Sequence, residues 1–295
     1  MKNSIILSVL MPLLLMAVFV AQTQASEVLR AAVSIPPQVY FLEKIGGTHV
    51  ETLCLLPAGA LPHSYEPTAR QMKELSQADL YVRIGVQFET AWWEKFSSVN
   101  PAMHVIDSGR GIEFLSGHAH TAHNEHRAEH RHEGHDPHVW LSPRTVKILV
   151  DNMYQGLAAI DPDHQESYRS NADAFLEELE TLDAEIRERL SSVTTRKFMI
   201  FHPAWSYFAR DYDLEQIPVE IEGKEPSARE MVDLMKRARH EQIRIIFVQP
   251  QTSRRSAETI ARQIGGQVEV LDPLAADWLD NMRRAAALLA KALSE

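Results

Sequence analysis

The chain has 295 residues, 45% hydrophobic and 24% charged, which is ordinary for a globular protein with one large or two medium domains. The formal net charge of −10 disfavours a nucleic-acid or anionic-membrane partner, so we expect no nucleic acid among the ligands. The single cysteine, Cys54, can form no internal disulfide and is predicted to be a core residue of the apolar run TLCLLP.

The first 25 residues have the pattern of a cleavable signal peptide. Lys2 gives a basic start, residues 5–20 are apolar, and small residues precede a cleavage site after Ala25. A membrane anchor is the alternative, but the apolar run is short for a span and Pro12 interrupts it. The predicted cleavage site has no cysteine, so a lipid anchor at the mature N-terminus is not expected. Export without disulfides favours a bacterial periplasm.

Four apolar runs alternate with helical patterns in the next part of the chain. The predicted strands are residues 28–35, 49–57, 78–85 and 103–109. The predicted helices are residues 39–45, 68–78 and 88–96. This alternation predicts a parallel sheet with helices on its faces.

A histidine-rich segment follows, and it predicts a surface loop over residues 117–136. Eight of the fourteen histidines of the chain lie between His118 and His138, interleaved with acidic residues and arginines. Such a composition cannot build a packed core. Imidazole suits zinc, copper, iron and nickel, so the segment indicates metal capture, with a solvated polar loop as the alternative. The accessory ligands predicted in the loop are His118, His120, His123, His126, His130, His132 and His135.

Two helical segments connect this loop to a second alternating pattern. Ser142 and Pro143 start a helix that runs to residue 160. A second helix, within residues 161–192, has about 29 residues and would span about 43 Å. We interpret it as a rigid strut between two lobes, because its apolar stripe lasts too few heptads for a coiled coil. Further strands are predicted at residues 197–202, 214–221, 243–250 and 267–273, with helices at 203–212, 227–241, 253–266 and 276–293.

The predicted fold class is therefore α/β, with two lobes built on parallel four-stranded sheets and joined by the long helix. The N-terminal lobe is predicted over residues 26–160 and the C-terminal lobe over residues 193–295. Helix, Ile-Gly-Gly, strand and proline recur in EKIGGTHVETLCLLP and RQIGGQVEVLDPLA. A distant duplication would explain this echo, and so would matched topology alone.

Four side chains that can bind a metal follow predicted strand ends: His63, His138, His202 and Asp272. Ligands of open α/β sheets bind at the carboxyl ends of the strands, so we expect all four at one edge. Three histidines and one aspartate can form a tetrahedral zinc shell. Each residue alone has an ordinary alternative, a loop histidine beside a proline or a turn aspartate. The other histidines outside the loop, His49, His104, His164 and His240, are predicted to be structural.

Several motifs resemble one known family. They are GALPHSYEPTARQMKELSQADLYVRIG, DPHVWLSP, FHPAWSYFA, EGKEPSA and VLDPL, in order from about residue 28 to the end. Together they are similar to the periplasmic metal-binding proteins of ABC importers for zinc and manganese. The resemblance implies that the metal is buried between two lobes joined by a long helix, with His63, His138, His202 and Asp272 as ligands.

The resemblance also bears on the metal. Manganese members have a carboxylate at the third ligand position, where this chain has His202, and the softer nitrogen favours zinc. A histidine-rich loop before the second ligand is typical of zinc members. The chain departs from some zinc members, because Pro62 replaces an acidic residue before the first ligand. Water can take the fourth position, so Asp272 is the least secure of the four ligands.

The hypothesis is a periplasmic high-affinity zinc receptor, without catalysis, that delivers Zn²⁺ to an ABC permease with its ATPase. We expect a monomer, and the long helix implies small closure motions. A receptor for manganese or another divalent metal is one alternative. A zinc hydrolase with Glu66 or Glu222 as base is another, although the chain has no His-Glu-x-x-His motif. A zinc buffer that uses the histidine-rich loop alone is a third. Glu66, Trp140 and Glu225 are candidates for orienting the ligands.

Overall fold

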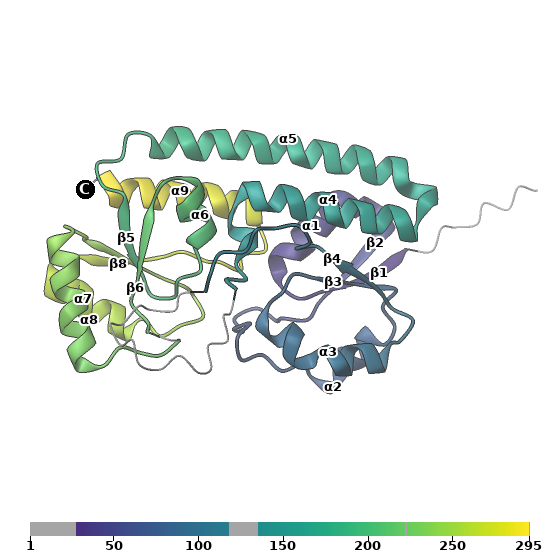
Figure 1. Ribbon diagram of the computed structural model, residues 1–295, viewed down its shortest axis with the longest axis horizontal. Helices are drawn as coiled ribbons and strands as arrows, with labels where there is room; N and C mark the ends of the chain where they lie inside the picture. The colour runs from purple at the N-terminus through teal and green to yellow at the C-terminus, as the bar shows by residue number, and fades with distance from the viewer. Residues whose placement is uncertain (1–27, 118–134, 222, 295) are drawn as a thin grey trace, which may run out of the picture.

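The computed structural model describes residues 28–117, 135–221 and 223–294 (Figure 1). The predicted signal peptide lies outside the described residues. So do all of the predicted accessory histidines except His135.

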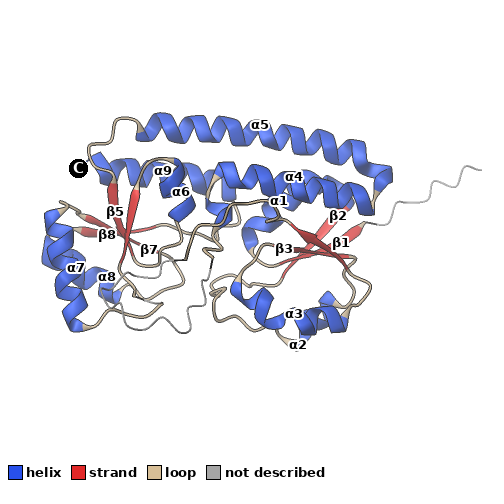
Figure 2. Cartoon of the chain, viewed as in Figure 1, coloured by secondary structure: helices blue, strands red, loops and turns tan. Residues whose placement is uncertain are grey.

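The first sheet contains four parallel strands in the order β2-β1-β3-β4. The strands are β1 (Leu29–Val33), β2 (Val50–Cys54), β3 (Leu80–Arg83) and β4 (His104–Asp107). The helices between them are α1 (Pro36–Gly46), α2 (Ala69–Leu75) and α3 (Gln87–Val99). In the views of Figures 1 and 2, α1 lies on one side of this sheet and α2 and α3 lie on the other.

The second sheet repeats this topology with the order β6-β5-β7-β8, again all parallel. The strands are β5 (Lys197–Ile200), β6 (Glu215–Pro218), β7 (Ile245–Val248) and β8 (Gln267–Val270). The helices are α6 (Ser206–Asp211), α7 (Ala228–His240), α8 (Arg255–Ile264) and α9 (Trp278–Ser294). The predicted fold of two four-stranded parallel sheets is confirmed.

Two long helices follow the first sheet, α4 (Pro143–Ile160) and α5 (Gln165–Leu190). The Ser142 hydroxyl caps α4 by accepting hydrogen bonds from the backbone N–H groups of Arg144 and Thr145, as the sequence predicts. The 26 residues of α5 span about 39 Å. Figure 1 shows α5 lying along both lobes, and it packs on α1, α4 and α9.

The two lobes share one hydrophobic core. A single cluster of buried residues includes Phe41 of α1, Phe175 of α5 and Phe198 of β5. A second cluster, with Met199 and Ile246, fills the space between the second sheet and helices α7 and α8. Relative motion of the lobes would disturb the shared cluster, so we expect only small displacements between them. Cys54, predicted to be a core residue, is only partly buried at the end of β2.

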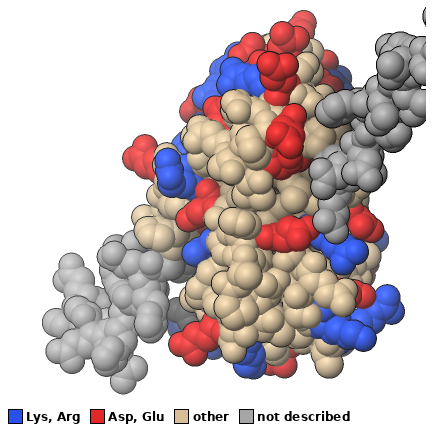
Figure 3. All heavy atoms as spheres, turned by 90° about the vertical axis from the view of Figure 1, so that its right-hand side faces the viewer, with Lys and Arg blue, Asp and Glu red and all other residues tan. Residues whose placement is uncertain are grey.

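The surface has mixed charge on the face that Figure 3 shows, where Lys and Arg alternate with Asp and Glu around a broad area of other residues. This face carries no continuous basic surface of the kind that binds nucleic acid. Within the described parts of the chain, no helix combines the length and the apolar composition that a membrane span requires.

Candidate metal centre

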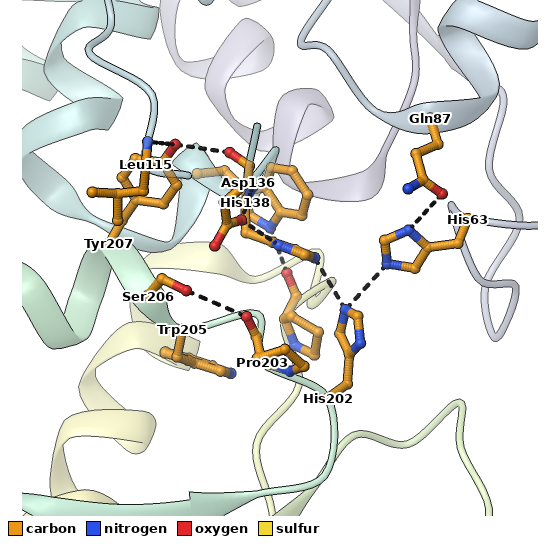
Figure 4. A network of polar contacts seen from close by, with 12 residues as sticks. His63, Gln87, Leu115, Asp136, His138, His202, Pro203, Trp205, Ser206 and Tyr207 are labelled. Atoms are coloured by element: carbon orange, nitrogen blue, oxygen red, sulfur yellow. Dashed lines mark hydrogen bonds and ion pairs between the residues drawn. The ribbon is translucent and has the colours of Figure 1, made fainter. Parts of the chain in front are cut away.

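Three of the four predicted ligands meet between the two lobes, at the edges of the two sheets where the strands have their carboxyl ends. His63 lies on the loop between β2 and α2, and His138 precedes the short 3₁₀ turn Val139–Leu141 that leads into α4. His202 comes two residues after β5. Strand-end placement thus brings residues from both lobes to one point, as Figure 4 shows.

The ring nitrogens of these histidines converge. His63 Nε2 lies 3.1 Å from His202 Nε2, and His202 Nε2 lies 3.3 Å from His138 Nε2. The ligand atoms of all three histidines lie within 4.8 Å of one another. Two nitrogens bound to zinc at 2.0–2.1 Å in a tetrahedral shell would be about 3.3–3.4 Å apart. The spacing between the rings therefore suits one small cation.

Each of the three histidines has an acceptor at its other ring nitrogen. His63 Nδ1 lies 2.9 Å from Gln87 Oε1, and His138 Nδ1 lies 2.7 Å from Asp136 Oδ1. The remaining ring, that of His202, has its Nδ1 2.6 Å from Glu220 Oε1. An amide oxygen or a carboxylate can only accept, so each Nδ1 carries the hydrogen and donates it.

This arrangement leaves the three neutral rings with their Nε2 lone pairs turned toward each other. Such a contact is repulsive unless a proton or a metal cation lies between the nitrogens. Fixing Nδ1–H by a carboxylate or an amide oxygen is also how proteins orient histidine ligands and raise their basicity. The geometry therefore presents a donor set for a cation that prefers nitrogen ligands.

The surroundings favour the neutral, metal-binding form of the imidazoles. Burial, followed by the repulsion that a proton on His138 or His202 would exert, lowers the pKa of His63 to about 4. Part of His63 is exposed, but its two ring nitrogens face His202 and Gln87. Burial also lowers the pKa of His138, although Asp136 opposes the shift.

Asp136 is ionised beside His138. Asp136 is only 3% exposed, and this burial acts to raise the pKa of its carboxyl group. Burial is the largest single influence, but the hydrogen bonds to Asp136, above all that from the His138 ring, and the attraction to a proton on that ring together outweigh it, so the pKa of Asp136 is lowered. The negative charge can thus compensate part of the charge of a bound cation.

The fourth predicted ligand, Asp272, lies past β8 as expected, but its side chain is used elsewhere. Its Oδ1 accepts hydrogen bonds from the backbone N–H of Leu274 at 2.9 Å and from Gln251 Nε2 at 3.3 Å. The group of ligand atoms identified among the described residues comprises the three histidines without Asp272. The role of Asp272 as a ligand stays a prediction.

The orienting groups are mostly not those that the sequence suggested. Glu66 is exposed, and Glu225 accepts a hydrogen bond from Ser256. Trp140 is the exception, because its ring lies against that of His138 with centroids 5.2 Å apart. The groups that hold the rings are Gln87, Asp136 and Glu220. Gln87 and Glu220 follow β3 and β6 within a few residues, so the strand-end rule places them at this edge without showing which histidine each of them contacts.

The remaining histidines that the structure describes have other surroundings. His135 packs against Phe114, with ring centroids 5.5 Å apart. His49 and His164 stack on each other with centroids 3.8 Å apart, and His164 Nδ1 lies 2.7 Å from Asp161 Oδ2. This pair joins the start of β2 to the corner between α4 and α5, as a structural role would require.

Comparison with known proteins agrees with this architecture. The chain resembles the "Zinc-binding protein AdcA" of Streptococcus pyogenes serotype M3, with 31% identity over 286 residues. That match covers 90% of the chain and 56% of the relative, so the chain spans about half the length of the curated relatives it matches.

Two solved structures of ZnuA are similar over nearly their whole length. A crystal structure of ZnuA matches with a TM-score of 0.85 and 44% identity, covering 91% of this chain and 100% of that one. A ZnuA deletion mutant with zinc bound matches with a TM-score of 0.83 and 45% identity, covering 91% and 99%. The family described as "Zinc-uptake complex component A periplasmic" matches residues 32–292, so the chain belongs to the ZnuA family of substrate-binding transport proteins.

Proposed function

We propose that this protein is a periplasmic zinc receptor that binds Zn²⁺ between its lobes and delivers it to an ABC import permease with its ATPase. The convergence of three Nε2 lone pairs from His63, His138 and His202 carries the proposal. Family membership and the zinc-binding names of the similar proteins support the transported ion and the location.

The all-nitrogen donor set supports zinc over manganese. Manganese prefers carboxylate, carbonyl and water ligands, whereas imidazole suits zinc, copper and nickel. The acidic groups at the site, Asp136 and Glu220, are turned to the histidine Nδ1 atoms. A manganese receptor would be expected to point at least one carboxylate at the ion.

Metal titration of the chain without residues 1–25 tests the proposal. We expect one tight Zn²⁺ site per chain and much weaker binding of Mn²⁺. His202→Ala should weaken zinc binding by more than the 10–100-fold that loss of an orienting partner typically costs. His240→Ala is the control, because the side chain of His240 is 84% exposed and lies on α7. Tight binding that survives His202→Ala would contradict the proposed site.

Delivery to a permease needs a separate test. In cells that lack their own zinc receptor, the wild-type chain together with the permease and ATPase of its importer should restore growth under zinc limitation. The His202→Ala variant should fail to restore it. Binding without restoration would leave a zinc-binding protein that does not serve the importer.

The ligand roles of Asp272 and of the loop histidines belong to this proposal as well. If Asp272 binds the ion directly, Asp272→Asn should weaken zinc binding about as strongly as His202→Ala. If water fills that position, the variant should bind zinc nearly as the wild type does.

A further inference from the structure

Two tryptophans exchange hydrogen bonds between the segment that carries His138 and the segment that carries Asp272. Trp140 donates its indole N–H to the carbonyl oxygen of Pro273 at 2.7 Å. Trp278 donates its indole N–H to the carbonyl oxygen of Trp140, also at 2.7 Å. Both side chains are 1% exposed. Buried hydrogen bonds of this length hold both backbone segments, because breaking one would leave a buried polar group unpaired.

Trp140 transmits this restraint to the metal centre. It is the second residue after His138, and the two rings are in contact with centroids 5.2 Å apart. The backbone N–H of Leu141 donates to the carbonyl oxygen of His138, which closes the 3₁₀ turn around Trp140. The position of His138 therefore depends on where the Trp140 backbone is held.

Trp278 itself is fixed from both lobes. It is the first residue of α9, which Figure 1 shows starting near the middle of the molecule and ending at the far edge of the second lobe. Its ring packs edge-on against Phe41 of α1, with centroids 5.1 Å apart. One turn later, Asn281 donates to the carbonyl oxygen of Asp272 at 2.7 Å. The first turn of α9 thus holds the backbones of both Trp140 and Asp272.

We infer that Trp278 is a positioning residue for the metal centre, whose indole N–H sets the position of His138 through the Trp140 backbone. The inference rests on the proposed zinc-binding function. It assigns part of the zinc affinity to a residue of the C-terminal helix that is none of the four predicted ligands. It also makes the geometry at His138 depend on the packing between the lobes.

Trp278→Phe removes the N–H and keeps an aromatic ring in the core. Trp205→Phe is the matched control, because Trp205 is buried and its Nε1 has no hydrogen-bond partner among the residues that the structure describes. Both variants lose the same atoms, but only the first loses the hydrogen bond. Trp205 lies only three residues from His202, which makes it a demanding control.

Two measurements on the full-length mature chain test the inference: zinc affinity by competition, and the visible absorption of bound Co²⁺, which reports ligand geometry. Trp278→Phe should bind zinc about 10-fold more weakly and alter the Co²⁺ spectrum. Trp205→Phe should leave both unchanged. If Trp278→Phe matches the wild type, or if both variants change equally, the inference is wrong. If the wild type itself fails to bind zinc, the proposed function fails instead.

A measurement on the wild type covers the case in which Trp278→Phe does not fold. Zinc binding should stabilise the His138 turn and with it the hydrogen bond from Trp278. Saturation with zinc should therefore slow hydrogen exchange at the Trp278 indole more than at the Trp205 indole, as followed by NMR. Equal slowing at the two indoles would overturn the inference.

Discussion

Each histidine of the candidate metal centre has an acceptor for its Nδ1–H, but the acceptors differ in charge. Asp136 and Glu220 are carboxylates, whereas Gln87 is a neutral amide. A carboxylate makes the imidazole a stronger donor to metal than a neutral acceptor does. His63 is therefore expected to be the weakest of the three ligands.

Replacing a charged acceptor by its neutral counterpart at one histidine, and the reverse at another, gives a matched pair of variants. Glu220→Gln keeps an acceptor for His202 Nδ1 but removes the charge, so zinc affinity should fall by about 10-fold. Gln87→Glu adds a charge beside His63 and should raise the affinity. Competition with a chromophoric chelator measures both. Equal affinity in the two variants would show that acceptor charge does not tune this site.

The pH dependence follows from the lowered pKa of His63, which burial and the proximity of the two other imidazoles bring to about 4. An ordinary imidazole, with a pKa near 6.5, would begin to lose metal to protons below about pH 6.5. Here the neutral ring is retained to lower pH, so zinc binding should persist through pH 6 and weaken toward pH 4. A titration that shows release with a midpoint near pH 6.5 would contradict this expectation.

The same shift has a consequence for the stability of the metal-free protein. In the unfolded chain His63 is protonated below its ordinary pKa of about 6.5, whereas in the folded chain it is protonated only below about 4. Between these pH values the unfolded state therefore binds more protons than the folded state. Stability should therefore be full above pH 6.5 and decline as the pH falls toward 4. In His63→Ala this decline should be shallower, which urea unfolding at several pH values would measure.

The positions of the three histidines could be predicted because they depend on strand ends, which the sequence pattern reveals. The roles of Gln87 and Glu220 could not, because they depend on distances between side chains that only the folded chain sets. Asp272 shows the limit of the strand-end rule. It lies at the expected edge, but its carboxylate accepts from the backbone of Leu274. A rule about edges does not say where a side chain points.

At the scale of secondary-structure elements, the repeated Ile-Gly-Gly has different physical causes in the two lobes. After α8, Gly265 has a φ of +69°, and a Cβ on Gly266 would lie 2.0 Å from the carbonyl oxygen of Arg244. After α1 the order is reversed. There Gly47 has a φ of +55°, and a Cβ on Gly46 would lie 2.5 Å from Val50 Cγ2. The two Ile-Gly-Gly sequences are therefore alike in sequence, but the glycines at matching positions have different structural roles.

Alanine at the two glycines after α8 should have unequal effects. Gly265→Ala places a Cβ in the left-handed region with no close neighbour, which costs about 1–2 kcal/mol. Gly266→Ala drives a Cβ into a backbone carbonyl that cannot move freely, so the loss should be roughly 3 kcal/mol or more. Urea unfolding measures both free energies. A larger loss for Gly265→Ala would show that the strand backbone yields more easily than this contact indicates.

At the scale of the whole molecule, the topology could be predicted because alternating strands and helices form parallel sheets. The shared core could not, since the sequence does not show which helix faces meet. Phe41, Phe175 and Phe198 come from separate elements, and they belong to one cluster because α5 lies along both lobes. The lobes are thus joined by a common interior as well as by a long helix, which strengthens the expectation of small closure motions.

The histidine-rich segment is anchored beside the metal centre, and this anchoring makes its contribution testable. Ser116 and His135 pair as an antiparallel bridge, and the backbone N–H of Asp136 donates to the carbonyl oxygen of Leu115 at 2.9 Å. Tyr207 of the second lobe donates to the carbonyl oxygen of Asp136 and accepts from the N–H of Leu115. The two ends of the segment are therefore held together independently of what lies between them.

Because its ends are already paired, residues 117–134 can be replaced by Asn-Gly, which suits a two-residue turn between antiparallel strands. We expect this deletion to keep one tight zinc site per chain, since His63, His138 and His202 are untouched. Weaker additional zinc binding by the loop histidines should disappear from the calorimetric titration. The same deletion combined with His202→Ala should abolish tight binding altogether. Loss of the tight site in the deletion alone would mean that the loop histidines, and not the three converging rings, form the principal site.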